Sequence, residues 1–124
     1  MTQPVDDGDL LQLSWHGDAL VVAPSGTIEA VDWVYIDQAA QVVLEPIRGQ
    51  EVPLVVFDLE QVTYFGSVFL ALLLRCQKLV KSKGGEMVLC SLTGPAQELL
   101  QITGLDMVWA IYDNRADALS AIGA

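Results

Sequence analysis

A short and almost entirely apolar run, Leu54 to Leu59, constrains this chain more than any other feature. The run is rich in β-branched and aromatic residues and lacks polar alternation, which is typical of a strand covered on both faces of a sheet. A loop at residues 60–65 follows, and an apolar segment with helical spacing opens at Ser67. We therefore expect a central β-strand that leads, through a short loop, into the amino terminus of a helix.

The rest of the chain repeats this alternation of strands and helices. Further strands are predicted at 11–15, 19–23, 87–90 and 107–111, and helices at 29–44, 67–83, 95–102 and from 113 or 114 to 122. Thr27 is a candidate N-cap for the first helix, Pro46 is expected to stop it, and Gly84-Gly85 and Gly104 are expected to end the next two. The order β-β-α-β-α-β-α-β-α predicts an α/β fold with a mixed, mostly parallel sheet of about five strands and about four helices, in which the first hairpin adds an antiparallel edge.

Length and charge limit the kinds of partner. The 124 residues suit a single domain, which we place at 10–124 behind an acidic tail at 1–9 that we expect to be disordered. Asp and Glu number 16 against 6 Lys and Arg, a net charge of −10, which argues against nucleic-acid binding and against attraction to anionic membranes. The longest apolar stretch has 7 residues, Val68 to Leu74, and the N-terminus has no hydrophobic signal core. We expect a cytoplasmic protein without direct membrane insertion.

Residues for catalysis or metal binding are scarce. The two cysteines, Cys76 and Cys90, stand apart from each other and from His16, the only histidine, so no metal site is predicted and both thiols are expected in the core. Asp58 and Glu60 flank the end of the central strand without a nucleophile–base pair, which favours loop hydrogen bonds over acid–base chemistry. No phosphate-binding glycine loop or nucleophile motif is present. We expect neither a cofactor nor an enzyme.

The helix that opens at Ser67 has two different sides. Helical geometry turns Val68, Phe69, Leu72, Leu73, Cys76, Leu79 and Val80 toward the sheet and leaves Ser67, Leu70, Ala71, Leu74 and Lys78 on the other side. An apolar patch beside Ser67 fits a partner face, a homodimer face or burial under a neighbouring element. Ser67 itself suits either a simple N-cap or a modifiable serine. Arg75, Lys78, Lys81 and Lys83 follow, and we expect them to complement the helix dipole in preference to forming an anion site.

The ordered set of short motifs resembles a known family. Its central block is Val55-Val56-Phe57-Asp58-Leu59, then Val62-Thr63-Tyr64-Phe65, then Ser67 and Leu70. The flanking matches are Pro24-Ser25-Gly26, Lys83-Gly84-Gly85, Leu99-Leu100, Thr103-Gly104-Leu105, Ile111-Tyr112-Asp113 and Ala118-Leu119. Together they resemble the STAS domain (sulfate transporter and anti-sigma-factor antagonist) over residues 10–122.

This resemblance implies a regulatory protein-binding domain of the anti-sigma-factor antagonist type. In that family the serine that aligns with Ser67 is phosphorylated by a partner kinase, usually an anti-sigma factor, and the unphosphorylated form binds that factor. The resemblance thus implies that Ser67 is the phosphoacceptor. The partner-binding residues that it implies are Gly26, Thr27, Gly66, Ser67, Leu70, Ala71, Leu74 and Lys78.

Two residues depart from the family pattern. Gly66 stands where the family commonly has Asp, and Phe69 stands where it usually has Gly. Both departures favour an alternative function, a phosphorylation-independent STAS adaptor or assembly subunit of a signalling or transporter complex.

Overall fold

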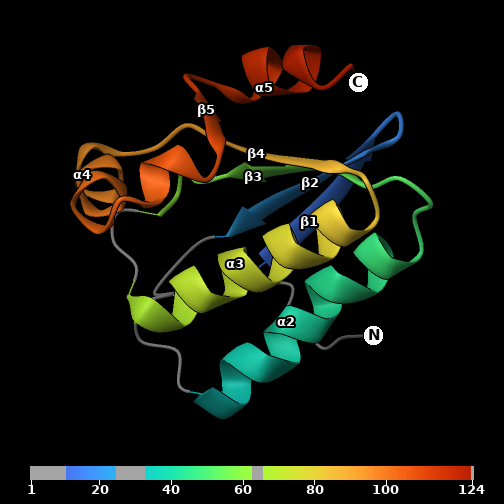
Figure 1. Ribbon diagram of the computed structural model, residues 1–124, viewed down its shortest axis with the longest axis horizontal. Helices are drawn as coiled ribbons and strands as arrows, with labels where there is room; N and C mark the ends of the chain where they lie inside the picture. Colours follow the sequence, from blue (N-terminus) through green and yellow to red (C-terminus); the bar gives the residue numbers. More distant parts are fainter. Residues whose placement is uncertain (1–10, 25–32, 63–65, 124) are drawn as a thin grey trace.

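A five-stranded mixed sheet runs through the centre of the molecule (Figure 1). The computed structural model describes residues 11–24, 33–62 and 66–123. The strands, in their order across the sheet, are β1 Leu11–His16, β2 Ala19–Pro24, β3 Leu54–Asp58, β4 Glu86–Cys90 and β5 Ala110–Tyr112. β1 pairs antiparallel with β2 as the predicted hairpin, and all other pairings are parallel.

Helices cover both faces of this sheet. Their bounds are α2 Trp33–Arg48, α3 Ser67–Ser82, α4 Gly94–Thr103 and α5 Arg115–Ala121, with a short 3-10 helix, η2, at Leu105–Met107. α2 and α3 lie side by side on one face, whereas α5 lies on the other (Figure 1). This architecture confirms the predicted α/β class and the mixed, mostly parallel sheet.

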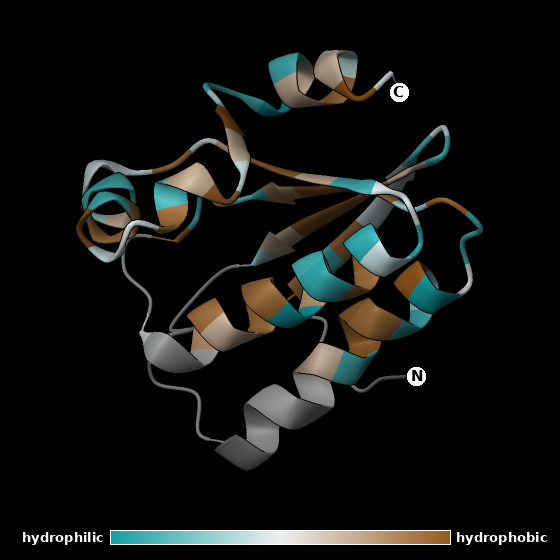
Figure 2. Ribbon diagram, viewed as in Figure 1, coloured by the Kyte–Doolittle hydropathy of each residue, from teal (hydrophilic) through white to brown (hydrophobic). Residues whose placement is uncertain are grey.

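Residues of the central strands alternate between two cores. Leu20, Val55, Phe57 and Leu89 belong to the larger core, which α2 and α3 cover. Their neighbours in sequence, such as Val56, belong to a smaller core under α5. Because both sides are buried, the central strands need apolar residues at every position, and Figure 2 shows them hydrophobic over most of their length. The uninterrupted run at 54–59 is explained by this arrangement.

Two predicted boundaries are wrong. Pro46 does not stop the first helix, because α2 continues through it to Arg48. The lost backbone hydrogen bond is outweighed by burial, since Ile47 is fully buried in the larger core. The last strand does not begin at Met107, which ends η2 and is 86% exposed. Gly104 turns the chain into η2 from a left-handed conformation, and the strand starts only at Ala110.

The predicted glycine stops are confirmed at the ends of α3 and α4. Gly84 and Gly104 have φ of 73° and 77°, the left-handed region in which glycine avoids the strain of a side chain. The predicted acidic tail at 1–9, the Thr27 cap and the first helix's start at Glu29 lie outside the described residues. Among the helices that are described, none has the length and apolar character to cross a membrane.

Candidate functional site at the start of helix α3

The connection from β3 to α3 is anchored at its beginning. After β3 the Leu59 amide donates to the Cys90 carbonyl at 3.0 Å, and the Val62 amide donates to the Leu59 carbonyl at 3.0 Å. Leu59 and Val62 are both buried in the larger core. The Thr93 hydroxyl, just before α4, donates to the Val62 carbonyl at 3.1 Å. The start of the loop is therefore held at the carboxyl edge of the sheet, where open α/β folds place their binding sites.

Gly66 is the N-cap of α3, and Ser67 is its first residue. Gly66 has an extended conformation, with φ −102° and ψ −167°, and its carbonyl accepts a hydrogen bond from the Leu70 amide at 3.1 Å. As a glycine, Gly66 has no side chain of its own with which to cap this helix end. The first turn of a helix has N–H groups without partners inside the helix, and the positive end of the helix dipole also lies there, so Ser67 is at a favourable place for added negative charge. The side chain of Ser67 is outside the described residues.

On the outer side of α3, the exposure of the side chains increases from Leu70 to Lys78. Leu70 and Ala71 are half-buried, and Leu70 packs against the larger core. Leu74 is 40% exposed and Lys78 is exposed. Because residues four apart stack on one side of a helix, Leu70, Leu74 and Lys78 form one row that leads away from Ser67. Of the sequence-predicted binding residues, Gly66, Leu70, Ala71, Leu74 and Lys78 are placed around this row, and Gly26 and Thr27 lie outside the described residues.

Phe69 points into the protein. It is 1% exposed and belongs to the larger core with Leu72, Leu73 and Cys76. The ring of Phe69 is thus accommodated in the larger core, although the family usually has Gly at this position. The departure leaves the outer row of α3 unobstructed.

Asp58 ends β3 and is buried, with 4% exposure. Its Oδ1 accepts a hydrogen bond from the Glu60 amide at 3.1 Å, and its Oδ2 accepts one from Nε of Arg115 at 2.8 Å. The sequence-based expectation of hydrogen bonding at Asp58 is confirmed. Arg115, the first residue of α5, was missed as its partner, because nothing in the sequence pairs positions 57 residues apart. The pair fixes α5 to the carboxyl edge of the sheet.

Both cysteines are unsuited to nucleophilic chemistry. Burial raises the pKa of the Cys76 thiol to about 12, with a small opposing effect of Arg75. Burial also raises the pKa of Cys90 to about 11, against the lowering effect of its hydrogen bond to Ser91. The reactive thiolate is therefore scarce at neutral pH. No cluster of potential metal ligands occurs among residues 11–24, 33–62 and 66–123.

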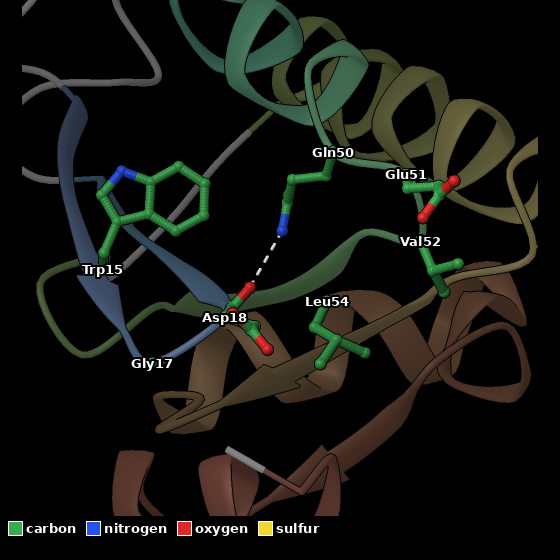
Figure 3. A pocket seen from close by; sticks show the side chains of 7 residues that line it. All are labelled: Trp15, Gly17, Asp18, Gln50, Glu51, Val52 and Leu54. Atoms are coloured by element: carbon green, nitrogen blue, oxygen red, sulfur yellow. Dashed lines mark hydrogen bonds between the residues drawn. The ribbon is translucent and has the colours of Figure 1, made fainter.

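A separate hollow of about 600 Å³ lies at the other end of the sheet, where the parallel strands begin (Figure 3). Gln50, just after α2, reaches across it, and its Nε2 donates to the Asp18 carbonyl in the β1–β2 turn at 2.9 Å. Trp15 lines the hollow and is 54% exposed. Because β3 begins here at Leu54, this hollow lies at the end of the sheet away from Ser67 and is not part of the candidate site.

Comparison with known proteins decides the family. The model of the STAS domain matches residues 12–118. The chain belongs to the STAS domain family. STAS domains of this antagonist type are regulatory and not enzymatic, so membership agrees with the absence of a catalytic motif in the sequence.

Relatives of this STAS domain share nearly its whole length. The Anti-sigma F factor antagonist of Paenibacillus polymyxa is 30% identical over 112 residues, which cover 90% of this chain and 93% of the relative. The solved STAS domain protein of Planctomyces limnophilus is 30% identical, with a TM-score of 0.81 over 92% of this chain and 98% of the other. An anti-sigma factor antagonist of Mycobacterium paratuberculosis has 26% identity and a TM-score of 0.76 over 100% of both chains.

Proposed function

We propose that this STAS domain is a cytoplasmic anti-sigma-factor antagonist whose binding to an anti-sigma factor is controlled by phosphorylation of Ser67. The position of Ser67 carries the proposal. It is the first residue of α3, at the carboxyl edge of the sheet, and the row of side chains that includes the exposed Leu74 begins beside it. The relatives from Paenibacillus polymyxa and Mycobacterium paratuberculosis, which are named as antagonists of this kind, support the same function.

The proposed switch works through charge at the edge of an apolar contact. Unmodified, the start of α3 and the Leu70–Leu74–Lys78 row would pack against the partner. A phosphate on Ser67 adds about −1.5 to −2 charges and three strong acceptors. The helix N-terminus tolerates this charge, because the free N–H groups and the dipole favour an anion there. The phosphorylated surface would no longer fit the partner, whereas the free energy of unfolding would not decrease.

The test measures the affinity of the cognate anti-sigma factor for four forms of the protein. They are the unmodified protein, Ser67→Ala, Ser67→Asp and Leu74→Glu. We expect Ser67→Ala to bind like the unmodified protein and Ser67→Asp to bind about tenfold or more weakly. Leu74→Glu is expected to bind weakly although its Ser67 is unchanged. Equal affinity of Ser67→Ala and Ser67→Asp for the anti-sigma factor would reject the switch.

A second candidate function rests on Gly66. The family's usual carboxylate is absent beside Ser67, which favours an adaptor that binds without phosphorylation. The same four forms separate the two functions, since an adaptor would bind equally well with any residue at 67 and would still lose binding with Leu74→Glu. Adding the carboxylate by Gly66→Asp is a further test, because a kinase that recognises the Asp-Ser pair would then phosphorylate Ser67 faster.

A further inference from the structure

Two large apolar side chains that are exposed in the described part of the chain lie at one place. Trp15 and Val52 are each 54% exposed, and both line the hollow of about 600 Å³ at the end of the sheet where the parallel strands begin (Figure 3). We refer to it as the amino-end hollow. Apolar surface gathered at a hollow is typical of binding sites, whereas single exposed apolar residues are ordinary. The residues that line it are Trp15, Gly17, Asp18, Gln50, Glu51, Val52 and Leu54.

The exposure of Trp15 follows from the pattern of β1. Leu11, Leu13 and Trp15 alternate along the strand and therefore share one side of it. Leu11 is buried in the larger core, and Leu13 packs against that core. Trp15 comes last, next to the β1–β2 turn, and more than half of its surface is exposed. The apolar row of β1 thus ends in an indole ring at the hollow.

Gln50 joins the two loops that form the hollow. Its Nε2 donates to the Asp18 carbonyl at 2.9 Å, which ties the connection between α2 and β3 to the β1–β2 turn. Its Oε1 is buried and has no hydrogen-bond partner among the described residues. A buried acceptor without a donor costs free energy. Because Gln50 lines the hollow, a small turn of its side chain would offer Oε1 to an N–H group there.

The charges at the hollow have one sign. Asp18 and Glu51 are exposed and line it, and none of the described Lys or Arg residues does. Arg48 is the cation closest to it along the chain, and its Nη1 is 3.6 Å from Oε1 of Glu45 and 3.3 Å from Oε1 of Gln41. The net charge of −10 adds attraction for cations at longer range. The hollow therefore favours a cationic occupant over an anion.

We propose that the amino-end hollow binds an arginine-containing segment of a partner protein. The guanidinium group would lie on the ring of Trp15 and donate to the carboxylates of Asp18 and Glu51. The apolar stem of the arginine would pack on Val52, and a further N–H group would donate to Oε1 of Gln50. Trp is the best aromatic partner for a cation, and Arg is the commoner cation in such contacts. Hydrogen bonds from guanidinium to carboxylate are charge-assisted, and a guanidinium has five donors to distribute.

A protein segment fits the hollow better than a small molecule does. Pockets for small molecules bury about 70–90% of the ligand surface. Here Gly17, Asp18 and Glu51 are exposed, as are Trp15 and Val52, so the hollow is open to solvent. Figure 3 shows Trp15 on one side of Gln50, and Glu51 with Val52 on the other. Trp and Arg are also the residues that most often contribute strongly to binding between proteins.

The amino-end hollow is separate from the proposed switch, and the inference goes beyond that function. β3 begins at Leu54, beside the hollow, and ends at Asp58, on the edge of the sheet where α3 begins. A strand rises about 3.3 Å per residue, so the two ends of β3 lie roughly 13 Å apart. Binding in the hollow should therefore be the same with Ser67→Ala and Ser67→Asp. It neither requires nor disproves control at Ser67.

The experiment is an NMR titration of the isotope-labelled whole chain. It follows the indole N–H signal of Trp15 and the backbone amide signals of Gly17 and Glu51. The probe is the peptide Gly-Arg-Leu-Arg-Gly, and the matched control peptide carries citrulline, an uncharged isostere, in place of both arginines. Trp15→Phe identifies the indole signal among the three tryptophans. We expect saturable shifts with the arginine peptide and a Kd about tenfold or more higher with the citrulline peptide.

The protein variants test which residues hold the peptide. Glu51→Gln removes a charge that lines the hollow, whereas Glu98→Gln makes the same change in α4, outside the hollow. We expect Trp15→Ala to raise the Kd about fivefold or more, Glu51→Gln about threefold or more, and Glu98→Gln less than about 1.5-fold. Far-UV circular dichroism should show that all variants are folded.

Three results would overturn the proposal. They are no shift of the Trp15 signal with the arginine peptide, equal binding of the citrulline peptide, and equal effects of Glu51→Gln and Glu98→Gln on the Kd. Free arginine amide is the final comparison. If it binds as tightly as the peptide, the hollow is a small-molecule site and the proposed protein partner is wrong.

Discussion

Replacing Gly66 by Asp should stabilise the fold, although it adds a charge to an already acidic chain. Gly66 is the N-cap of α3 and has no side chain with which to cap that helix end. Its φ of −102° is accessible to any residue, and a Cβ placed there meets no atom of the described residues within 4 Å. An Asp side chain can thus be added without backbone strain, and as an N-cap it can accept a hydrogen bond from an N–H group of the first turn.

Three effects determine by how much Gly66→Asp should raise the free energy of unfolding. Asp exceeds Gly as an N-cap by a few tenths of a kcal/mol. Loss of glycine's freedom in the unfolded chain adds about 0.4–1 kcal/mol, and a negative charge at the helix N-terminus adds about 0.3–1 kcal/mol. Repulsion within a chain of net charge −10 subtracts from this sum. We expect a net gain of about 1 kcal/mol, which corresponds to a rise in Tm of about 4 °C.

Urea unfolding followed by far-UV circular dichroism measures this free energy of unfolding. Gly66→Ala is the matched control, because it restricts the unfolded chain in a similar way, but Ala is a much poorer N-cap than Gly and offsets that gain, so we expect no net stabilisation from it. The charge contribution should shrink in high salt, since dipole interactions are screened. Equal stabilities of the Asp and Ala variants, or destabilisation by Asp, would refute the N-cap geometry on which the reasoning rests.

Three further predictions concern the frame around the site. Arg115→Ala should lower the free energy of unfolding by about 1–3 kcal/mol, because Asp58 keeps a buried charge without its cation; an unchanged urea midpoint would show that the pair contributes nothing. Gly85→Ala should destabilise by about 2 kcal/mol or more, since its Cβ would overlap the Pro53 carbonyl oxygen, and wild-type thermal stability would contradict this. Burial raises the pKa of the Cys76 thiol to about 12, whereas the thiol of the unfolded chain loses its proton above about pH 8.5. The free energy of unfolding should therefore fall as the pH rises above about 8.5, and this decline should be shallower in Cys76→Ala.

Local sequence patterns predicted the frame of the molecule well. The apolar run at Leu54–Leu59 forms β3 and the buried residue after it. A strand that is buried on both faces needs an apolar residue at nearly every position, so the run can be recognised from the sequence alone. Gly104 was recognised as a stop because a left-handed helix end favours glycine. These inferences depend only on neighbours in the chain.

Features that depend on distant contacts were not predictable. Pro46 was read as a helix stop, whereas the neighbouring Ile47 is held in the core by residues from other elements. Met107 has the apolar character of a strand residue, yet it lies exposed in η2. Arg115 shows no relation to Asp58 until the sheet brings the two together.

The candidate site shows the same division. Helical periodicity separated the inner residues of α3, such as Phe69, from the exposed Leu74. It could not show that Leu70 is half-buried against the core, because that depends on the packing of α3 on the sheet. The hollow of about 370 Å³ between α2 and α3 likewise requires Arg48 of one helix to lie near Arg75 of the other.

Phosphorylation of Ser67 can be measured on the protein from the cells that produce it, by intact-mass analysis and peptide mapping with phosphatases inhibited. We expect one phosphate, on the peptide that contains Ser67, in a fraction of molecules that changes with growth and stress. A protein that stays unmodified at Ser67 under all those conditions would contradict the switch and leave the phosphorylation-independent adaptor.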